Sequence, residues 1–154
     1  MIKQSTRETA LKRLEVFIGE WKVRLGGLVA QPEDEGALSV FEWALDGQFL
    51  IQRTEVPDPK FPTVLSLVAY DVNKDSYTQH YFDSRGVVRL YAMTFRDGIW
   101  TLVRSSPDFT PLDFSQRFTG RFSADGDSIS GTWETGDGSN WKKDFDLTYA
   151  RVKR

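Results

Sequence analysis

Cysteine is absent from the 154 residues of this chain, and histidine occurs only once, as His80. Without cysteine the chain forms no disulfide and offers no thiol nucleophile. A zinc site normally needs several histidines or cysteines or a cluster of carboxylates, so a single histidine argues against one. The sequence also lacks a phosphate-binding or dinucleotide-binding glycine motif and a Gly-x-Ser-x-Gly elbow. We therefore expect no metal and no organic cofactor.

Long apolar runs are missing as well. No stretch of about 18 apolar residues suggests a membrane span, and residues 1–7 lack the apolar core of a signal peptide. Lys and Arg (20) nearly balance Asp and Glu (22), and the two signs are interspersed. Because there is no basic stripe, nucleic acid is not an expected partner. A soluble, cytoplasmic protein is the expectation.

The sequence pattern predicts a series of short strands separated by turns. Asp-Gly pairs lie at 46–47, 97–98, 125–126 and 137–138. Asp-Gly between alternating apolar runs is a strong signal for a tight β-hairpin. Strands are expected over residues 20–29, 37–46, 48–56, 63–72, 76–83, 87–96, 99–105, 115–124, 127–135 and 140–152.

A short helix is expected ahead of the strands. Thr6 is suited to cap its N-terminus, apolar residues recur at helical spacing through Phe17, and Gly19 ends it. A chain of consecutive hairpins removes its exposed edges by closing on itself. The sequence therefore predicts a single all-β domain over residues 1–154. Its expected form is an antiparallel up-and-down β-barrel of about ten strands, with the N-terminal helix capping one end.

Tight turns also predict which side chains point inward, because directly paired residues share a face of the sheet. The hairpin around the second Asp-Gly pair matches Phe95 with Trp100, and the hairpin around the third matches Phe118 with Trp133. The inward face of these strands then carries aromatic rings together with four polar residues, Arg89, Tyr91, Arg104 and Gln116.

Two other hairpins leave a choice. Around the first Asp-Gly pair, a turn slightly longer than two residues gives the cleaner split into faces and places Trp43 and Arg53 inside. Between the fifth and sixth strands, a two-residue turn places His80 inside, whereas a three-residue turn places Gln79 and Tyr81 there. Both versions of that turn remain open. A continuous buried lining is expected from Trp43, Phe95, Trp100, Phe118, Trp133 and Phe145.

Polar side chains gather at one end of the expected barrel. Alternate turns of an up-and-down barrel lie at alternate ends, so Arg53, Arg89 and Arg104 approach the end with the proline-containing loops 57–62 and 105–112. Arginine is suited to carboxylate or phosphate, and aromatic side chains supply the apolar wall of a ligand pocket. We expect a carrier or sensor of a small apolar or amphipathic molecule with an anionic group. The predicted ligand-binding residues are Arg89, Arg104, Tyr91, Gln116, His80, Trp43 and Arg53.

Two other interpretations stay open. The arginines are also suited to a rim position with their heads in water, or to ion pairs with Glu42, Glu55 or Asp83. A barrel enzyme, an isomerase or hydrolase, would use His80 with Tyr91 and Asp83 for acid–base chemistry, which requires His80 to point inward. A homodimer is a possible assembly.

Several segments resemble known barrel families. Gly19-Glu20-Trp21, at the start of the first strand, resembles the Gly-x-Trp opening of the lipocalin and wider calycin superfamily. Residues 41–53 and 80–91 resemble a bacterial family of lipocalin-like barrels, and this likeness covers most of the chain. The resemblance implies a barrel fold and the binding of a small molecule.

The strand number is also similar to that of ten-stranded fatty-acid-binding and nitrobindin-type barrels. Nitrobindin-like proteins hold haem through a histidine near the C-terminus, whereas residues 141–149 contain none. Fatty-acid-binding proteins hold a carboxylate with Arg-x-Tyr on the final strand. Here that order is reversed in Tyr149-x-Arg151, and Arg89-x-Tyr91 lies on a middle strand. The resemblance therefore implies a carrier without haem of that type.

Overall fold

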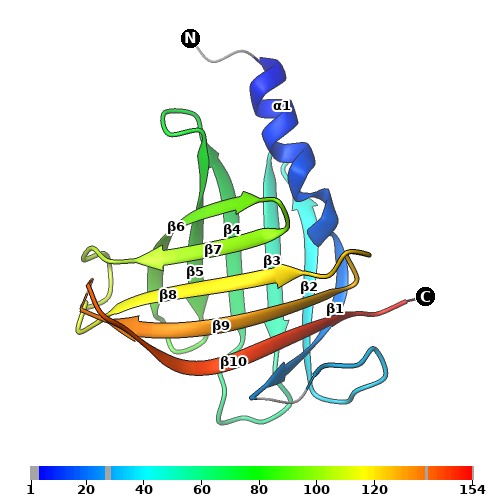
Figure 1. Cartoon of the computed structure of the whole chain (residues 1–154), viewed down its shortest axis with the longest axis vertical. Coiled ribbons are helices and arrows are strands. Elements are labelled where there is room, and N and C mark those ends of the chain that lie inside the picture. Colours follow the sequence, from blue (N-terminus) through cyan, green and yellow to red (C-terminus); the bar gives the residue numbers. More distant parts are fainter. Residues whose placement is uncertain (1–3, 27–28, 138, 154) are drawn as a thin grey trace.

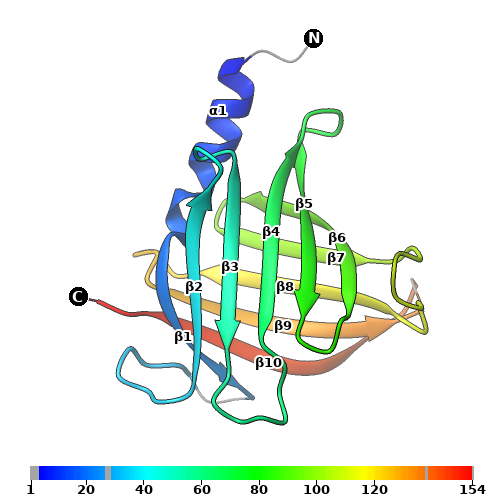
Figure 2. The same ribbon diagram turned by 180° about the vertical axis from the view of Figure 1, so that it is seen from behind.

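The computed structural model of this chain describes residues 4–26, 29–137 and 139–153. A helix, α1, is followed by a 3₁₀ turn and ten strands (Figures 1 and 2). Their bounds are α1 Gln4–Lys12, the 3₁₀ turn Arg13–Phe17, β1 Gly19–Leu25, β2 Ala37–Ala44, β3 Phe49–Glu55, β4 Val64–Asp71, β5 Ser76–Asp83, β6 Val88–Arg96, β7 Ile99–Arg104, β8 Ser115–Phe122, β9 Ser128–Gly136 and β10 Trp141–Arg151.

The strands form one closed barrel in which each strand pairs antiparallel with its neighbours in sequence. β1 pairs with both β2 and β10, which closes the ring. The predicted all-β, up-and-down barrel with one short N-terminal helix is confirmed. The helix begins at Gln4, before the predicted cap at Thr6, and its last turn tightens into 3₁₀ geometry before Gly19.

Two of the Asp-Gly hairpins have the predicted register. Asp97 and Gly98 have φ of 52° and 74°, which is typical of a type I′ turn, and Phe95 pairs with Trp100. Between β8 and β9, Phe118 pairs with Trp133 as expected. Gly138 of the fourth Asp-Gly pair lies outside the described residues.

The face expected for β3 is wrong. Trp43 pairs with Leu50, so the hairpin keeps the register of a two-residue turn at Asp46-Gly47 rather than a longer one. Both turn residues have positive φ, as a type I′ turn requires, and such turns match the twist of the flanking strands. This one-residue difference in register moves every side chain of β3 to the opposite face of the sheet from the predicted one. Gln52 therefore points inward, and Arg53 lies on the outer face.

Between β5 and β6 the structure selects the three-residue version of the turn. Gln79 pairs with Tyr91, and His80 pairs with Leu90. The Gly86 N–H donates to the Asp83 carbonyl at 2.9 Å, which closes this turn. Gln79 and Tyr81 consequently point into the barrel, whereas His80 lies on the outer face.

The helical segment closes one end of the barrel, beside the β2–β3 and β4–β5 turns (Figures 1 and 2). Phe17 is fully buried there. Its ring centroid lies 5.0 to 5.3 Å from those of four rings carried by the strands, Phe41, Phe95, Trp100 and Phe122. Tilted and edge-on pairs at these distances are favourable beyond their buried area, so this end is a packed aromatic plug.

Trp21 joins the plug to β10. Its indole N–H donates to the Phe17 carbonyl at 2.8 Å, and the Arg151 guanidinium lies 4.2 Å above its ring. Arg151 also donates to the carbonyls of Val16 and Ile18. Trp21 therefore closes this end against the helical segment.

A pair of facing glycines makes room for Phe118. Gly120 and Gly131 are directly paired, and a Cβ at Gly131 would lie 2.5 Å from the Phe118 ring. Of the six aromatic residues expected to form the lining, Phe95, Trp100 and Phe118 are buried and Trp43 and Trp133 are half-buried. Phe145 is 37% exposed, so its predicted burial is wrong: it lies toward the open rim of the barrel.

Candidate functional site

A cavity of about 250 Å³ lies inside the barrel toward the end opposite the helix. Strands from both sides of the barrel contribute to it, and the β3–β4 loop covers it with Phe61 and Pro62. The lining residues are Val23, Leu25, Ala37, Gln52, Thr54, Val56, Phe61, Pro62, Val64, Ser66, Gln79, Tyr81, Trp100, Leu102, Phe118, Trp133, Phe145, Leu147 and Tyr149. None of these described lining residues is charged.

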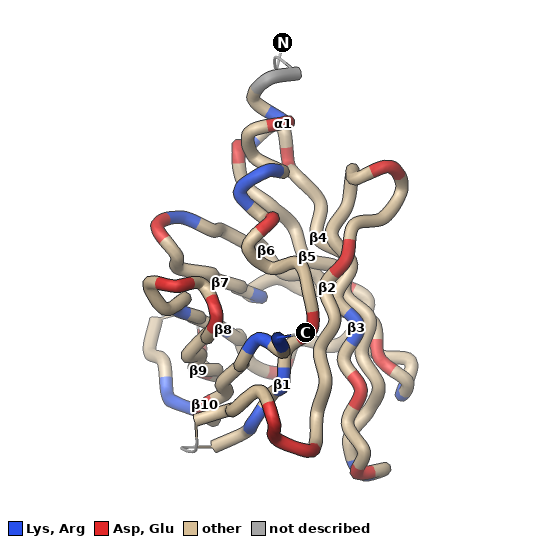
Figure 3. Tube along the Cα trace, turned by 90° about the vertical axis from the view of Figure 1, so that its right-hand side faces the viewer, with Lys and Arg blue, Asp and Glu red and all other residues tan. Residues whose placement is uncertain are grey.

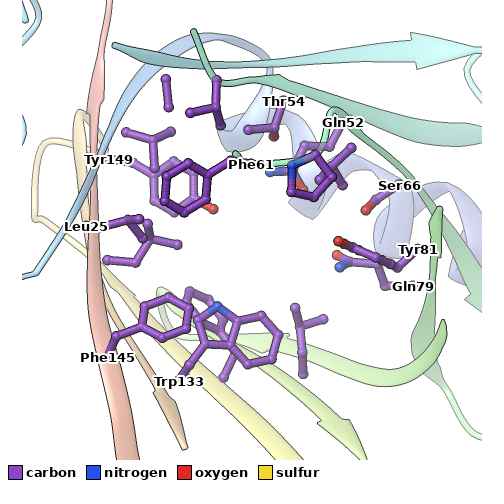
Figure 4. Close-up of a pocket in the computed structure, with 18 of the residues that line it drawn as sticks. Leu25, Gln52, Thr54, Phe61, Ser66, Gln79, Tyr81, Trp133, Phe145 and Tyr149 are labelled. Atoms are coloured by element: carbon purple, nitrogen blue, oxygen red, sulfur yellow. The ribbon is translucent and has the colours of Figure 1, made fainter. Parts of the chain in front are cut away.

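The cavity has two chemically different sides (Figure 4). Ser66, Gln79 and Tyr81, on β4 and β5, lie together on one side with polar ends toward the open space. Trp133 and Phe145, on β9 and β10, lie along another side and present rings to it. The site therefore combines an apolar aromatic wall with an amide and hydroxyl wall.

Several polar groups in and beside the cavity lining already have partners. The Gln52 amide donates to Ser39 Oγ at 2.9 Å, and Ser39 Oγ lies 2.9 Å from Thr54 Oγ1. The Tyr81 hydroxyl donates to Asp83 Oδ2 at 2.8 Å. Gln79 and Trp100 differ, because the Gln79 side-chain oxygen and the Trp100 indole N–H are buried without a hydrogen-bond partner among the described residues.

The ionisable groups beside the cavity are held in fixed protonation states. Burial raises the pKa of the Tyr81 hydroxyl, and the hydrogen bond to Asp83 raises it further. Desolvation acts to raise the pKa of Asp83, but hydrogen bonds from Arg85 and Tyr81 outweigh it and lower the pKa to about 2. Burial raises the pKa of Tyr149 to about 12. Near neutral pH both tyrosines are therefore neutral, and Asp83 is ionised but paired.

Arg104 points inward and is 3% exposed, as its register predicted, but its guanidinium is engaged by the protein. Its Nε and one terminal nitrogen donate to the two oxygens of Asp108 at 2.8 and 2.9 Å. The same terminal nitrogen donates to the carbonyls of Thr110 and Pro111. The hydrogen bond from Arg104 lowers the pKa of Asp108. Arg104 thus fixes the β7–β8 loop.

The other inward polar residues lie beside the cavity rather than on its lining. Arg89 lies with its guanidinium 5.9 Å from the centre of the Tyr81 ring, and its Nε is buried without a partner. Tyr91 is buried, and its hydroxyl donates to Gln116 Oε1 at 3.3 Å. Among the described residues no carboxylate forms an ion pair with Arg89.

Three predicted site residues lie farther away. His80 is on the outer face, where Nε2 lies 3.1 Å from Thr78 Oγ1. Arg53 is exposed on the outer face and pairs with Glu42. Trp43 points inward toward the closed end, where it packs against the core. The predicted residues therefore do not form one cluster.

Sequence reasoning missed the amide and hydroxyl wall. Gln79 and Tyr81 belonged to one of the two versions of the β5–β6 turn, and the choice depended on a single residue in that turn. The longer turn expected before β3 brings Arg53 inward in place of Gln52, whereas the observed register is one residue shorter. A preference for the tightest Asp-Gly turn would have placed Gln52 correctly.

Along the chain trace in Figure 3, acidic and basic positions are interspersed over the elements. In the described ranges no group of three or more His, Asp or Glu side chains is arranged to hold a metal ion. No helix within those ranges has both the length and the apolar character to cross a membrane.

Fold and site together define a closed ten-stranded antiparallel barrel with an internal, mostly apolar cavity. A solved structure with this fold is that of Rv2717c from M. tuberculosis, with a TM-score of 0.62 and 18% sequence identity. The match covers 94% of this chain and 98% of that chain, and at this identity it shows a shared fold alone. No protein-family model matches the chain, and no curated protein is significantly similar to it.

Proposed function

We propose that this protein is a carrier or sensor that binds a small apolar molecule inside the barrel. The observation that supports this most directly is the cavity of about 250 Å³ in a barrel whose other end is filled by aromatic rings. Protein interiors are normally close-packed, so a space of this size lined by aliphatic and aromatic side chains is suited to a ligand.

We propose an uncharged ligand in place of the anionic one predicted from the sequence. Burying a charged ligand without an opposite charge beside it is costly. None of the described lining residues is charged, so the cavity offers no such partner. Of the three arginines expected at the site, Arg53 is outside and Arg104 is bound to Asp108. Support for an anionic group is thereby reduced to Arg89, which lies next to the cavity wall rather than on it.

The alternative of an acid–base enzyme loses its central residue, because His80 faces away from the cavity. We put forward no reaction for this site. Membership of the lipocalin-like barrels, a cytoplasmic location and a homodimer remain predictions from the sequence.

Native mass spectrometry of the freshly purified protein tests the central proposal, because a ligand that co-purifies adds a defined mass. Calorimetric titration with benzoic acid and its methyl ester then tests the ligand charge. We expect the ester to bind at least as tightly as the acid, both to the wild-type protein and to Arg89→Ala. A preference for the acid that Arg89→Ala abolishes would restore the anionic site.

A variant with a larger side chain in the cavity tests whether the ligand binds there. Thr54 lines the cavity, so Thr54→Phe should weaken the binding of methyl benzoate while thermal unfolding stays cooperative. Absence of a bound mass together with absence of saturable binding by both probes would contradict the proposed function.

A further inference from the structure

Two polar groups of the cavity lining are buried without a hydrogen-bond partner among the described residues, the side-chain oxygen of Gln79 and the indole N–H of Trp100. The oxygen of Gln79 is an acceptor that lacks a donor. Gln79 is 4% exposed and lines the cavity, and no residue in the described part of the chain forms a hydrogen bond with its Oε1. Nearly all buried polar groups in native proteins are paired, so each exception needs an explanation. Figure 4 shows its amide end directed into the open space of the cavity.

In this structure no described residue donates a hydrogen bond to Gln79 Oε1. The Tyr81 hydroxyl donates to Asp83, and the Tyr91 hydroxyl donates to Gln116. The Gln52 amide donates to Ser39. A donor for Gln79 is therefore most readily supplied by a molecule inside the cavity.

The other walls constrain the shape of that molecule. The rings of Phe118 and Trp133 are packed with centroids 5.1 Å apart, and Phe145 extends the same side toward the rim. Such a wall favours a flat ring, which stacks or meets it edge to face. A cavity of about 150 Å³ holds benzene, so by proportion about 250 Å³ suits roughly ten non-hydrogen atoms.

Building on the proposed function, we infer that the ligand is an uncharged, flat ring compound of about this size with an N–H or O–H on its edge. Gln79 Oε1 accepts the hydrogen bond from that group, while the ring lies against Trp133 and Phe118. The amide oxygen thus determines ligand specificity, because an analogue of the same shape without the donor leaves Oε1 unpaired.

The pair indole and benzofuran tests this inference, because the two rings have nearly the same shape and only indole has an N–H. We expect calorimetric titration to show indole binding about 10- to 100-fold more tightly to the wild-type protein. N-methylindole, which keeps the nitrogen but loses the donor, should behave like benzofuran.

Gln79→Leu removes the acceptor at similar volume and should abolish the preference for indole. Gln31→Leu is the matched control, because Gln31 is an exposed glutamine that does not line the cavity. It should keep the preference. Circular dichroism melting curves establish that both variants are folded.

The outcomes separate the two proposals. Equal binding of indole and benzofuran to the wild-type protein, or a preference that survives in Gln79→Leu, would overturn the role of Gln79 and leave a binding cavity in place. Binding of neither ring to the wild-type protein would overturn the inference about the ligand. It would contradict the proposed function only together with the absence of a co-purified mass and of saturable binding of the acid and ester probes.

Discussion

The closed and open ends of the barrel are built on the same strands but have different interiors. At the closed end Phe17 and Trp21 are fully buried among aromatic rings. At the open end the strands surround a cavity, and Gln52 and Gln79 take inward positions. We infer that the aromatic packing at the closed end supplies much of the folding stability. The open end can then retain a cavity and a buried acceptor without a partner among the described residues.

The two proline-containing loops at the open end also differ, because one is held by buried hydrogen bonds and the other, among the described residues, is not. The β7–β8 loop is fixed through Asp108, which accepts hydrogen bonds from Arg104 and from the Leu90 and Thr110 N–H groups. The β3–β4 loop instead places Phe61, 45% exposed, over the cavity. One loop serves as a fixed support and the other as a cover.

The largest expected effect is at the closed end. Phe17→Ala should lower the free energy of unfolding by about 4 kcal/mol, because truncating a buried phenylalanine leaves a cavity among several rings. Urea denaturation measures the change. Phe61→Ala at the open end is the control and should lose less than about 1 kcal/mol. Similar losses in both variants would contradict the division between a stabilising end and a binding end.

The next effect concerns the fixed loop. Asp108→Asn should cost about 3 kcal/mol at neutral pH, because it leaves the buried Arg104 guanidinium without its countercharge. The exposed Asp113 lies in the same loop, so Asp113→Asn is the control and should have little effect.

The ion pair between Arg104 and Asp108 also predicts that the free energy of unfolding depends on pH. The pKa of Asp108 is lowered in the folded state by its bond from Arg104, so the folded state binds this proton less readily than the unfolded state. The stabilisation is therefore complete above about pH 4 and is lost as the pH falls below that value. Urea titrations from pH 7 to pH 2 should show the gap between wild type and Asp108→Asn narrowing below pH 4. A gap that stays constant would contradict the ion pair.

The third effect concerns the packing between the two ends. Gly131→Ala should cost about 2 kcal/mol, because the new Cβ would overlap the Phe118 ring. Displacing that ring toward the cavity should also weaken binding of the ring probes. Ser130→Ala, at an exposed neighbouring position, is the control. Unchanged stability in Gly131→Ala would mean that the ring moves aside freely.

The sequence predicted the barrel and the faces of four strands because tight Asp-Gly turns set the register, as Phe95 opposite Trp100 shows. It misassigned β3 because Phe49 and Ile51 are apolar yet lie on the outer face, half-buried. Because β3 has apolar residues on both faces, its sequence lacks the alternation of apolar and polar residues that indicates which face is buried.

The site was harder to predict than the fold. The partner of Arg104 is Asp108, which lies in an irregular loop whose path no periodic pattern describes. The cavity arises from the volume that the inward side chains leave unfilled, and that volume depends on all of them at once. Gln79 could be named only as one of two alternatives, because a single turn residue separates it from His80.

The smallest expected effect distinguishes two glutamines of the same cavity. Gln52→Leu should lower the free energy of unfolding by about 1 kcal/mol, because the Gln52 amide donates to the buried Ser39 hydroxyl. Gln79→Leu should leave stability unchanged or raise it, because it removes an acceptor that has no partner and replaces it with an apolar group of similar size. Urea denaturation of the ligand-free variants, after refolding from denaturant to remove any bound molecule, measures both. A loss in Gln79→Leu as large as that in Gln52→Leu would show that the protein itself satisfies this oxygen, and the case for a donor on the ligand would then fail.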